Sequence, residues 1–387
     1  MRLALAFSLL ASTAAAQTCG GNVSSFIKGA KAEAQREGVP ASVTNAFFQG
    51  AAIDPAVIRA DRSQGVFQKD FISFSRALIS QNRVSNAQVY SNRFDRTFRA
   101  IEQRFGIPRG VLLAFWAFET DFGQVQGNFN TRNALLTLAH DCRRPELFRP
   151  QLIAAMKLMA RGDFDPARTT GAWAGEIGQV QMLPEDIIER GMDGDGDGRV
   201  DLKNSSPDAL MSGANVLSSL GWRPNEPWLQ EVIMPANFDW SKTGLNNKFR
   251  VSQLASAGVQ ARAGSLGPSN LQAAILLPMG RNGPAFIAYP NFDVYFEWNK
   301  SFVYVTTAAY FGTRIMGASP YNAGNPSAAL TGDQMQSLQR KLQARGYDVG
   351  GIDGILGAKT RAAVQAEQVR LGLPADAWPT TGLLNAL

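Results

Sequence analysis

The stretch from Pro108 to Gly123, PRGVLLAFWAFETDFG, most constrains how this chain can fold. Apolar residues fill almost every position from Val111 to Phe118, which predicts a helix buried nearly all round. Pro108 suits the first turn of a helix, and Gly123 is a natural end. One carboxylate, Glu119, lies near the end of this helix. The fold must therefore place a carboxylate at the edge of its core.

Aromatic residues accompany Glu119 along the predicted helix. Phe115 and Trp116 come four and three residues earlier, and Phe122 comes three residues later, so all three share its face. A carboxylate walled by rings loses hydration, which raises its pKa, and the negative end of the helix dipole acts in the same direction. These are the conditions for a general acid near neutral pH. The alternative is a buried ion-pair member or a simple helix end, because structural networks also perturb carboxylates.

The first 16 residues, MRLALAFSLLASTAAA, predict a secretory signal peptide. They start with a basic residue, continue with an apolar run and end in small residues of the A-x-A type. The mature chain is expected to begin at Gln17 and to reach the periplasm. No later segment is long and apolar enough to cross a bilayer, so no transmembrane segment is expected.

Two cysteines, Cys19 and Cys142, remain in the exported chain. In an oxidising compartment such a pair favours a disulfide. A redox role is the weaker interpretation because the chain has no C-x-x-C motif. The single histidine, His140, excludes most Ser-His and Cys-His chemistry unless it takes part, and we interpret it as structural.

The charge balance is mildly basic. The chain carries a net charge of +6, and loss of the leader with its one arginine leaves +5. This favours an anionic polymer as partner. Nucleic acid is not expected, because the sequence has no zinc finger, RNA-binding signature or dense Lys/Arg run.

The length of 387 residues predicts two or more units. Helical patterns cover residues 25–104, and the stretch from Asp61 to Ile79 is interpreted as helical, with Phe67, Phe71 and Phe74 on one face. Two further helices are expected between residues 134 and 160, with a break at residues 143–145.

The second half of the chain changes character. A helix is expected from Asp208 to Leu220, and short apolar runs between residues 249 and 292 predict the strands of a small sheet. Helix returns over residues 299–316. Residues 317–330, rich in Gly, Pro, Ala and Asn, predict a linker, and residues 331–387 a separate small unit.

An acidic loop follows residue 192. Asp193, Asp195 and Asp197 occupy positions 1, 3 and 5 of a calcium loop of the EF-hand type, with glycine at position 6. Position 12 is Asn204, not Glu, so Asp208 is the candidate for the missing late carboxylate. We predict a structural Ca²⁺, because three carboxylates this close repel one another without a cation; the alternative is a solvated acidic turn.

Two polar segments are weaker signals. The Gly-rich stretch from residue 171 to 184 carries Gln179 and Gln181, which point in opposite directions if the chain is extended there. Asn299, Ser301 and Tyr304 either bind sugar hydroxyls and acetamides or cap a helix.

Four motifs together carry a resemblance. Glu119-Thr-Asp-Phe-Gly123, W-A-G-x-x-G-x-x-Q-x-x-P, D-G-D-G-D-G-R-V-D-L and N-F…W-N-x-S-x-x-Y follow one another in order. They resemble the lytic murein transglycosylase B family in its soluble periplasmic form, over roughly residues 19–316. The tail resembles a type 1 peptidoglycan-binding domain, through Gly346, Tyr347, Asp353, Gly354, Gly357, Thr360 and Ala363.

The resemblance implies a mainly helical α+β fold. It consists of a lysozyme-like catalytic domain (residues 17–316) with extra helical and small β parts, a linker, and a three-helix C-terminal domain (residues 331–387). It also implies the substrate, the glycan strands of peptidoglycan, and leaves open which other cell-wall proteins are partners. Glu119 would be the sole acid and base for cleavage of the bond between N-acetylmuramic acid and N-acetylglucosamine, forming a 1,6-anhydro ring with help from the 2-acetamido group.

The resemblance assigns further residues as well. Gln181, Asn299 and Tyr304 would contact the substrate. Ca²⁺ would be held by the carboxylates of Asp193, Asp195, Asp197 and Asp208 and the carbonyl of Arg199.

The chain departs from the family pattern at several positions. Ala172 replaces a serine, Glu176 adds an acid, and Trp298 replaces a tyrosine; Met182 and Glu367 each replace an aromatic residue. These departures keep two alternatives open: a catalytically weak or inactive peptidoglycan-binding scaffold, and a hydrolytic muramidase.

Overall fold

The structure is a computed structural model that describes residues 19–63 and 69–387. The predicted signal peptide and Phe67 lie outside the described residues. The chain divides into two compact units. Of the described residues, the first unit comprises 19–62 together with Gly127–Ile177 and Leu183–Ile188, and the second comprises the others.

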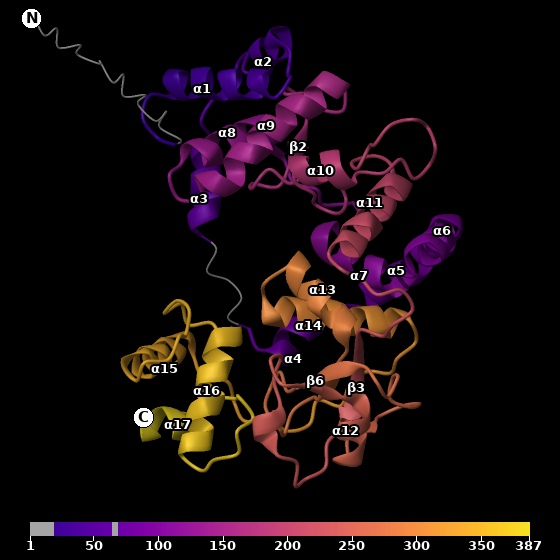
Figure 1. Ribbon diagram of the computed structural model, residues 1–387, viewed down its shortest axis with the longest axis vertical. Coiled ribbons are helices and arrows are strands. Elements are labelled where there is room, and N and C mark those ends of the chain that lie inside the picture. The colour runs from indigo at the N-terminus through magenta and orange to yellow at the C-terminus, as the bar shows by residue number, and fades with distance from the viewer. Residues whose placement is uncertain (1–18, 64–68) are drawn as a thin grey trace, which may run out of the picture. The chain divides into compact units, whose positions relative to one another are not determined.

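The first unit consists of helices and one short two-stranded ribbon. Its elements are α1 (Val23–Arg36), α2 (Ala41–Phe47), α3 (Pro55–Arg62), β1 (Phe129–Asn130), α8 (Thr131–His140), α9 (Pro145–Arg161), β2 (Thr170–Gly171) and most of α10 (Pro184–Arg190). Helices α8 and α9 pack side by side, and α1 and α2 both pack on α9 (Figure 1). The predicted break between α8 and α9 is confirmed.

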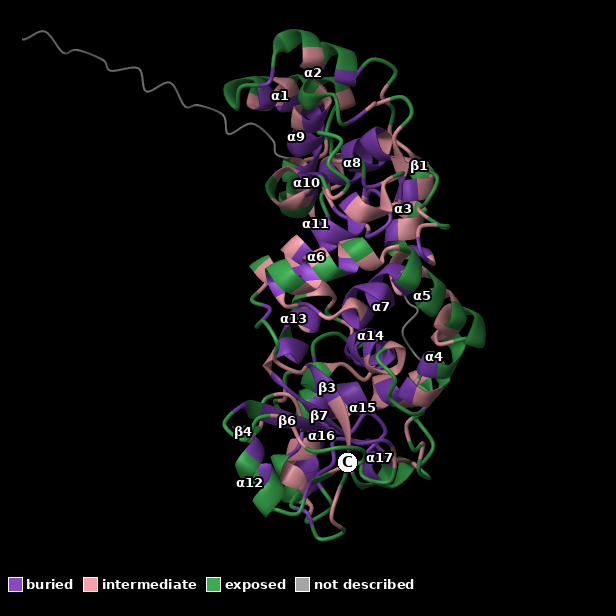
Figure 2. Ribbon diagram, turned by 90° about the vertical axis from the view of Figure 1, so that its right-hand side faces the viewer, coloured by how far each residue is buried: buried purple, intermediate pink, exposed green. Residues whose placement is uncertain are grey.

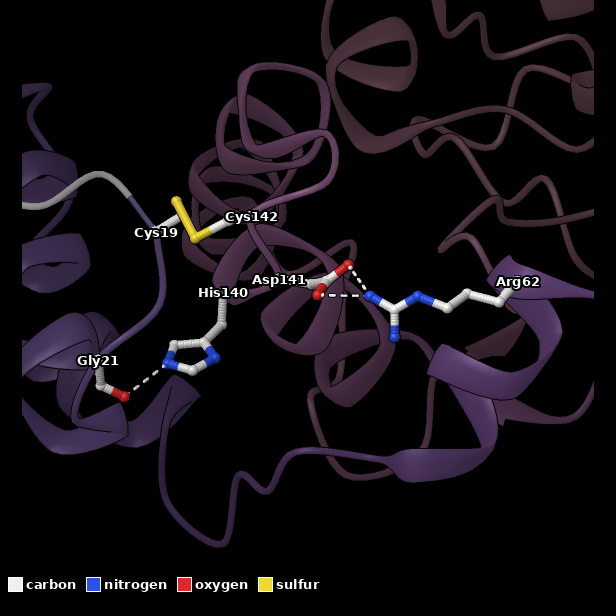
Figure 3. The surroundings of a disulfide bond; sticks show 6 residues. All are labelled: Cys19, Gly21, Arg62, His140, Asp141 and Cys142. Atoms are coloured by element: carbon white, nitrogen blue, oxygen red, sulfur yellow. Dashed lines mark hydrogen bonds and ion pairs between the residues drawn. A yellow bond between two sulfur atoms is a disulfide. The ribbon is translucent and has the colours of Figure 1, made fainter. Parts of the chain in front are cut away.

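The expected disulfide lies in that break. Cys19 is bonded to Cys142, which ties the start of the described chain to the turn after α8 (Figure 3). His140 reinforces this attachment, because its Nε2 lies 3.1 Å from the Gly21 carbonyl and its ring meets the edge of Phe26 with centroids 5.2 Å apart. The interpretation of His140 as structural agrees with these contacts.

The second unit holds the remaining elements. Its helices before the sheet are α4 (Phe71–Leu78), α5 (Gln81–Arg93), α6 (Asp95–Phe105), α7 (Arg109–Thr120) and α11 (Ser206–Ser219). The sheet region contains β3 (Leu229–Ile233), η1 (Trp240–Lys242), β4 (Lys248–Arg250), α12 (Val251–Ser256), β5 (Gln260–Ala261), β6 (Gln272–Leu276) and β7 (Phe286–Ala288). After it come α13 (Pro290–Trp298), α14 (Phe302–Ile315), α15 (Gly332–Ala344), α16 (Ala358–Arg370) and α17 (Thr381–Ala386).

The five strands form an antiparallel sheet in the order β4-β6-β7-β3-β5. The apolar runs at β6 and β7 were predicted, and in the centre of the sheet Ile275 lies opposite Ile287. Both side chains are fully buried in a core shared with Val251 and Leu254 of α12. The sheet thus has its own hydrophobic core, as a small β subdomain should.

Helices α7 and α14 of the second unit pack closely along their lengths, and Figure 2 shows both as mainly buried. Two glycines allow this approach: a Cβ on Gly110 would meet the carbonyl oxygen of Gly312 at 2.7 Å. Gly110 is near the start of α7 and Gly312 near the end of α14, so the helices run antiparallel. The end of α7 therefore lies beside the start of α14.

One helix prediction needs correction. The stretch from Asp61 to Ile79 is not a single helix, because α3 ends at Arg62 and α4 begins at Phe71. Asp70 accepts a hydrogen bond from the Ser73 amide and so caps the start of a new helix. Apolar periodicity alone missed this cap.

The C-terminal region consists of α15, α16 and α17 around Leu338, Leu342, Val364 and Leu383. Residues 317–330 have no helix or strand. They are nevertheless attached: the Tyr321 hydroxyl lies 2.9 Å from the Ser75 hydroxyl. No helix of the described chain combines the length and the apolar character that a membrane crossing requires.

Candidate active site

The candidate site begins at the C-terminal end of α7. Glu119 is partly buried in the last helical turn. The helix ends at Thr120, one residue later, because Asp121, Phe122 and Gly123 have φ angles of 50°, 60° and 85°. Left-handed conformations at non-glycine residues are uncommon. Such strain is typical of functional sites, where the surrounding structure holds it in place.

Two side chains from other helices donate hydrogen bonds to Glu119. The Tyr304 hydroxyl lies 2.5 Å from Glu119 Oε1, and the Trp298 Nε1 lies 3.0 Å from the same oxygen. Trp298 is the last residue of α13, and Tyr304 lies in the first turn of α14. The antiparallel contact of α7 with α14 thus brings the carboxylate to Tyr304.

Both donors meet one carboxylate oxygen, which separates the roles of the two oxygens. Oε1 accepts from two groups that are always protonated at neutral pH. When Glu119 is protonated, its proton therefore belongs on Oε2. The site holds the carboxyl group in one orientation and leaves Oε2 to give or take a proton.

The surroundings raise the pKa of Glu119. Burial is the largest cause, and it outweighs the hydrogen bonds from Tyr304 and Trp298, which act to lower the pKa. The pKa of Tyr304 is raised well above its ordinary value by burial, by the charge of Glu119 and by their hydrogen bond. Tyr304 therefore remains a neutral donor, and Glu119 has the protonation behaviour of a general acid.

The three rings predicted to surround Glu119 divide into two groups. Phe115 stacks on Trp298 with centroids 4.6 Å apart, so it supports the indole that donates to Glu119. Trp116 and Phe122 pack against each other, with centroids 5.5 Å apart, and both also contact Tyr90 of α5. Because the helix ends at Thr120, the helical spacing that predicted a shared face for Phe122 does not apply.

The Gly-rich segment, whose residues 178–182 belong to the second unit, attaches to the end of α7. The Thr120 hydroxyl donates to the Gln179 carbonyl oxygen at 2.6 Å and accepts from the Gly123 amide at 2.9 Å. A Cβ at Gly123 would meet Gln179 Oε1 at 2.7 Å, which explains the glycine there. The second predicted motif is therefore fixed to the turn that follows Glu119.

Gln181, two residues after Gln179, has an uncommon backbone conformation with a φ of 54°. Its Nε2 donates to the Gly178 carbonyl oxygen at 2.7 Å, and the side chain is only partly buried. The fully buried glutamine is Gln179, which the sequence placed in the same motif without a role.

Asn299 and Ser301 act as local backbone caps. Asn299 Oδ1 accepts from the Ser301 amide at 2.8 Å, and the Ser301 hydroxyl accepts from the Tyr304 amide at 3.4 Å. The capping alternative thus describes both residues, while Tyr304 reaches Glu119. Ser301 consequently fixes the turn of α14 from which Tyr304 projects.

The carboxylates of Asp193, Asp195 and Asp197 gather in the acidic loop. Each offers an oxygen, and these oxygens all lie within 4.8 Å of one another, exposed to solvent. Oxygen ligands at such spacing suit a hard divalent cation. Main-chain hydrogen bonds from Gly198 and Gly196 help to keep the pKa of Asp193 below its ordinary value, so this side chain is charged at neutral pH.

Asp208 has a different position from the one expected of a fourth ligand. It is 1% exposed and lies outside the three-carboxylate group. Its Oδ1 accepts from the Gly194 amide and its Oδ2 from the Asp201 amide, both at 2.8 Å. The Asp208 side chain therefore stabilises the loop by binding main-chain amides of the loop. The predicted Arg199 lies in the same loop and is exposed.

Gln179 connects the acidic loop to the end of α7. Its amide donates to the Leu202 carbonyl oxygen at 2.9 Å, its Nε2 to the Lys203 carbonyl oxygen at 3.2 Å, and its Oε1 accepts from Ser206 at 3.1 Å. Through its main chain and its side chain, this one buried residue joins three of the predicted motifs.

The sequence reasoning missed Trp298, Thr120 and Gln179 as parts of the site. Trp298 was noted only as a substitution, although its position in the W-N-x-S-x-x-Y segment was a usable signal. Thr120 lay inside the motif from Glu119 to Gly123, but nothing in the sequence indicated its hydrogen bond to Gln179.

Comparisons with known proteins find relatives of this chain. Residues 22–313 match the family described as Transglycosylase SLT domain, and residues 331–387 match a peptidoglycan-binding domain family. The chain is 27% identical over 249 residues to the membrane-bound lytic murein transglycosylase B of Escherichia coli (strain K12). That alignment covers 63% of this chain and 67% of the relative.

Solved structures that are similar to this chain agree with the family match. SltB3 from Pseudomonas aeruginosa, in complex with NAG-anhNAM-pentapeptide, superposes with a TM-score of 0.86 at 35% identity, covering 95% of this chain and 99% of that one. The Escherichia coli lytic transglycosylase SLT35 in complex with calcium gives a TM-score of 0.65 at 24% identity, over 77% and 96% of the two chains. The predicted lysozyme-like, mainly helical α+β fold is confirmed.

Proposed function

This chain belongs to the Transglycosylase SLT domain family, and from that membership we propose that it cleaves peptidoglycan glycan strands with Glu119 as its single acid and base. The observation that carries the proposal is the double hydrogen bond to Glu119 Oε1 from Tyr304 and Trp298. These two bonds hold the Glu119 carboxyl group in place and leave Oε2 available. Burial raises the Glu119 pKa, so the group stays protonated at a higher pH than an ordinary glutamate.

The reaction starts with proton transfer from Glu119 Oε2 to the glycosidic oxygen between N-acetylmuramic acid and N-acetylglucosamine. The bond from C1 of the muramoyl residue to that oxygen breaks, and N-acetylglucosamine leaves with the proton as a 4-hydroxyl group. The 2-acetamido oxygen of the muramoyl residue stabilises the positive C1, in place of a second carboxylate.

The second half of the reaction returns the proton. The C6 hydroxyl of the same muramoyl residue attacks C1 and gives its proton to the ionised Glu119, closing a 1,6-anhydro ring without water. The SltB3 complex contains a NAG-anhNAM-pentapeptide, a ligand with this type of end. Tyr304 and Trp298 stabilise the ionised carboxylate between the two steps, because both donate to it.

Asp121 does not act as a second catalytic carboxylate in this proposal. It lies in the turn after α7, and its Oδ1 is 3.0 Å from Nε of Arg83. This partly buried ion pair is a structural contact, and it keeps the Asp121 carboxylate engaged with Arg83. A mechanism with one carboxylate is therefore the natural one for this helix end.

Gln181 and Asn299 are assigned to the substrate-binding surface around Glu119. Both are partly buried and each has side-chain hydrogen-bonding capacity beyond its local contact. We place the catalytic domain at residues 17–316, the linker at residues 317–330 and the peptidoglycan-binding domain at residues 331–387, with export to the periplasm directed by residues 1–16.

We assign Ca²⁺ to the loop of Asp193, Asp195 and Asp197, with the Arg199 carbonyl as a further ligand. Three negative charges this close favour a cation, and calcium accepts oxygen ligands in flexible geometry. Asp208 organises the loop backbone beneath them. The ion stabilises the loop, which in turn holds Gln179 at the end of α7.

The test is digestion of purified peptidoglycan by wild type and two variants. Glu119→Gln keeps an acceptor for both donors but has no proton to give, so release of soluble fragments should fall by at least about 10²-fold. Asp121→Asn, two residues away, is the matched control and should retain most activity. Unchanged release by Glu119→Gln would overturn the proposal, and binding without cleavage by the wild type would indicate the scaffold alternative.

A further inference from the structure

A buried arginine of the C-terminal domain lies against the helix that carries Tyr304. Arg361 of α16 is 8% exposed, and its guanidinium carbon lies 4.4 Å from the centroid of the Phe302 ring. Phe302 is the first residue of α14 and is itself 6% exposed. A guanidinium over an aromatic face at this distance is an attractive contact that strengthens when water is excluded.

The remaining contacts of Arg361 fix it to the sheet region. Its Nη2 donates to the Pro278 carbonyl oxygen at 2.8 Å and its Nη1 to the Leu277 carbonyl oxygen at 3.4 Å. Burial lowers the pKa of Arg361 to about 9. The charge of Asp376 opposes this lowering of the pKa only in part. The planar guanidinium suits the site, because it can donate to two carbonyl oxygens and lie over an aromatic ring at the same time.

The contact between domains extends along α16. One turn after Arg361, Gln365 Nε2 donates to the Thr243 carbonyl oxygen at 3.0 Å. Asp376 Oδ2 accepts from the Arg281 amide at 3.0 Å, and a Cβ at Gly280 would meet Trp378 at 2.6 Å. These backbone-level contacts describe a docked domain, in contrast to one held only by a flexible linker.

A short path leads from this docking contact to the catalytic carboxyl group. Phe302 begins α14 directly after the Ser301 cap, and Tyr304 lies two residues further on. The Tyr304 hydroxyl donates to Glu119 Oε1 at 2.5 Å. A shift of the first turn of α14 would therefore move the donor away from the carboxylate.

We propose that Arg361 is a positioning residue for the reaction: by clamping Phe302, the C-terminal domain holds the first turn of α14 so that Tyr304 meets Glu119. This inference rests on the proposed role of Glu119. It gives the peptidoglycan-binding domain a second task besides contact with the polymer, because the docked domain completes the active site.

The test compares Arg361→Lys with Gln365→Ala in the full-length chain. Lysine keeps the charge and loses the planar fork, so kcat should fall about tenfold while KM stays within about twofold. Loss of the Tyr304 hydrogen bond removes a cause that lowers the Glu119 pKa, so the alkaline limb of the kcat profile should move to higher pH. Gln365→Ala weakens docking without touching Phe302, and its pH profile should match the wild type.

A double-mutant cycle isolates the path through Tyr304. In a Tyr304→Phe background, Arg361→Lys should have no further effect on kcat. The inference would be overturned if Arg361→Lys lowered kcat equally in the wild-type and Tyr304→Phe backgrounds. It would also be overturned if Gln365→Ala shifted the pH profile as Arg361→Lys does. Circular dichroism confirms folding, and Phe302→Leu replaces Arg361→Lys if that variant does not fold. Full activity of Glu119→Gln would instead reject the proposed function.

Discussion

The hydroxyl of Thr120 and the main-chain carbonyl of Gln179 are hydrogen-bonded at 2.6 Å, which locks the Gly-rich segment onto the residue after Glu119. Thr120→Val keeps the shape and leaves the buried carbonyl group without this donor. Stability should fall by about 1–3 kcal/mol, and kcat should fall with it, because the end of α7 loses its anchor. Denaturant unfolding and turnover assays measure both effects.

The matched control for that variant is Thr313→Val. The Thr313 hydroxyl donates within its own helix, to the Tyr310 carbonyl oxygen at 2.7 Å. It should lose little stability and no activity. Equal effects of the two substitutions on kcat would contradict the anchoring role of Thr120.

Tyr304 should control the pH dependence of cleavage. Its hydrogen bond is the larger of the two side-chain contacts that oppose the raised pKa of Glu119, and that of Trp298 is the smaller. Tyr304→Phe should therefore raise the Glu119 pKa further and move the alkaline limb of the kcat profile to higher pH. Trp298→Phe should move it in the same direction by less. A shift to lower pH in either variant would contradict this electrostatic account.

Glu119 should reduce stability at neutral pH. Its pKa is raised above 4.5 in the folded protein. Below pH 4.5 the group is protonated in both states, and as pH rises through the folded pKa the unfolded state gains stability by ionising first. Glu119→Gln should therefore melt at a higher temperature than the wild type near pH 8, and the gain should vanish near pH 4.

Calorimetry at the two pH values measures this difference. A gain of about 2 °C corresponds to roughly 1 kcal/mol for a medium-sized domain. A pH-independent difference between Glu119→Gln and wild type would mean that the carboxyl group is not perturbed by folding.

The acidic loop should make stability depend on calcium. A chelator should lower the melting temperature of the wild type, and Asp193→Asn should abolish that response, because it removes one of the three clustered carboxylates. Asp208→Asn should differ: its side chain holds backbone amides, so stability should fall by about 1–3 kcal/mol with or without calcium. A chelator response that survives in Asp193→Asn would place the ion elsewhere.

Local patterns in the sequence were sufficient for much of the fold. The apolar run around Phe115 predicted α7, and the turn residues around β6 and β7 predicted the sheet. The sequence did not reveal α13, because only Tyr289 separates Pro290 from β7 and the helix that Pro290 begins has little apolar periodicity. It also missed β3, whose pairing with β7 is set by contacts distant in the chain.

The candidate site was predictable only as far as each motif could be interpreted alone. Glu119 stood out because a lone carboxylate in an apolar helix is chemically unusual. Its hydrogen bond to Trp298 joins residues 179 positions apart, and it depends on how α7 approaches the helices that follow the sheet. The role of Gln179 likewise follows from the left-handed turn at Asp121, which no spacing rule predicts.

The identity of the sugar ends tests the account most directly. Purified peptidoglycan is digested with the wild-type chain, and the released muropeptides are analysed by mass spectrometry. The account predicts 1,6-anhydro muramoyl ends, which lack one water relative to reducing ends, and none from Glu119→Gln. Reducing muramoyl ends would contradict it, because they require a water molecule as nucleophile and would identify the chain as a muramidase.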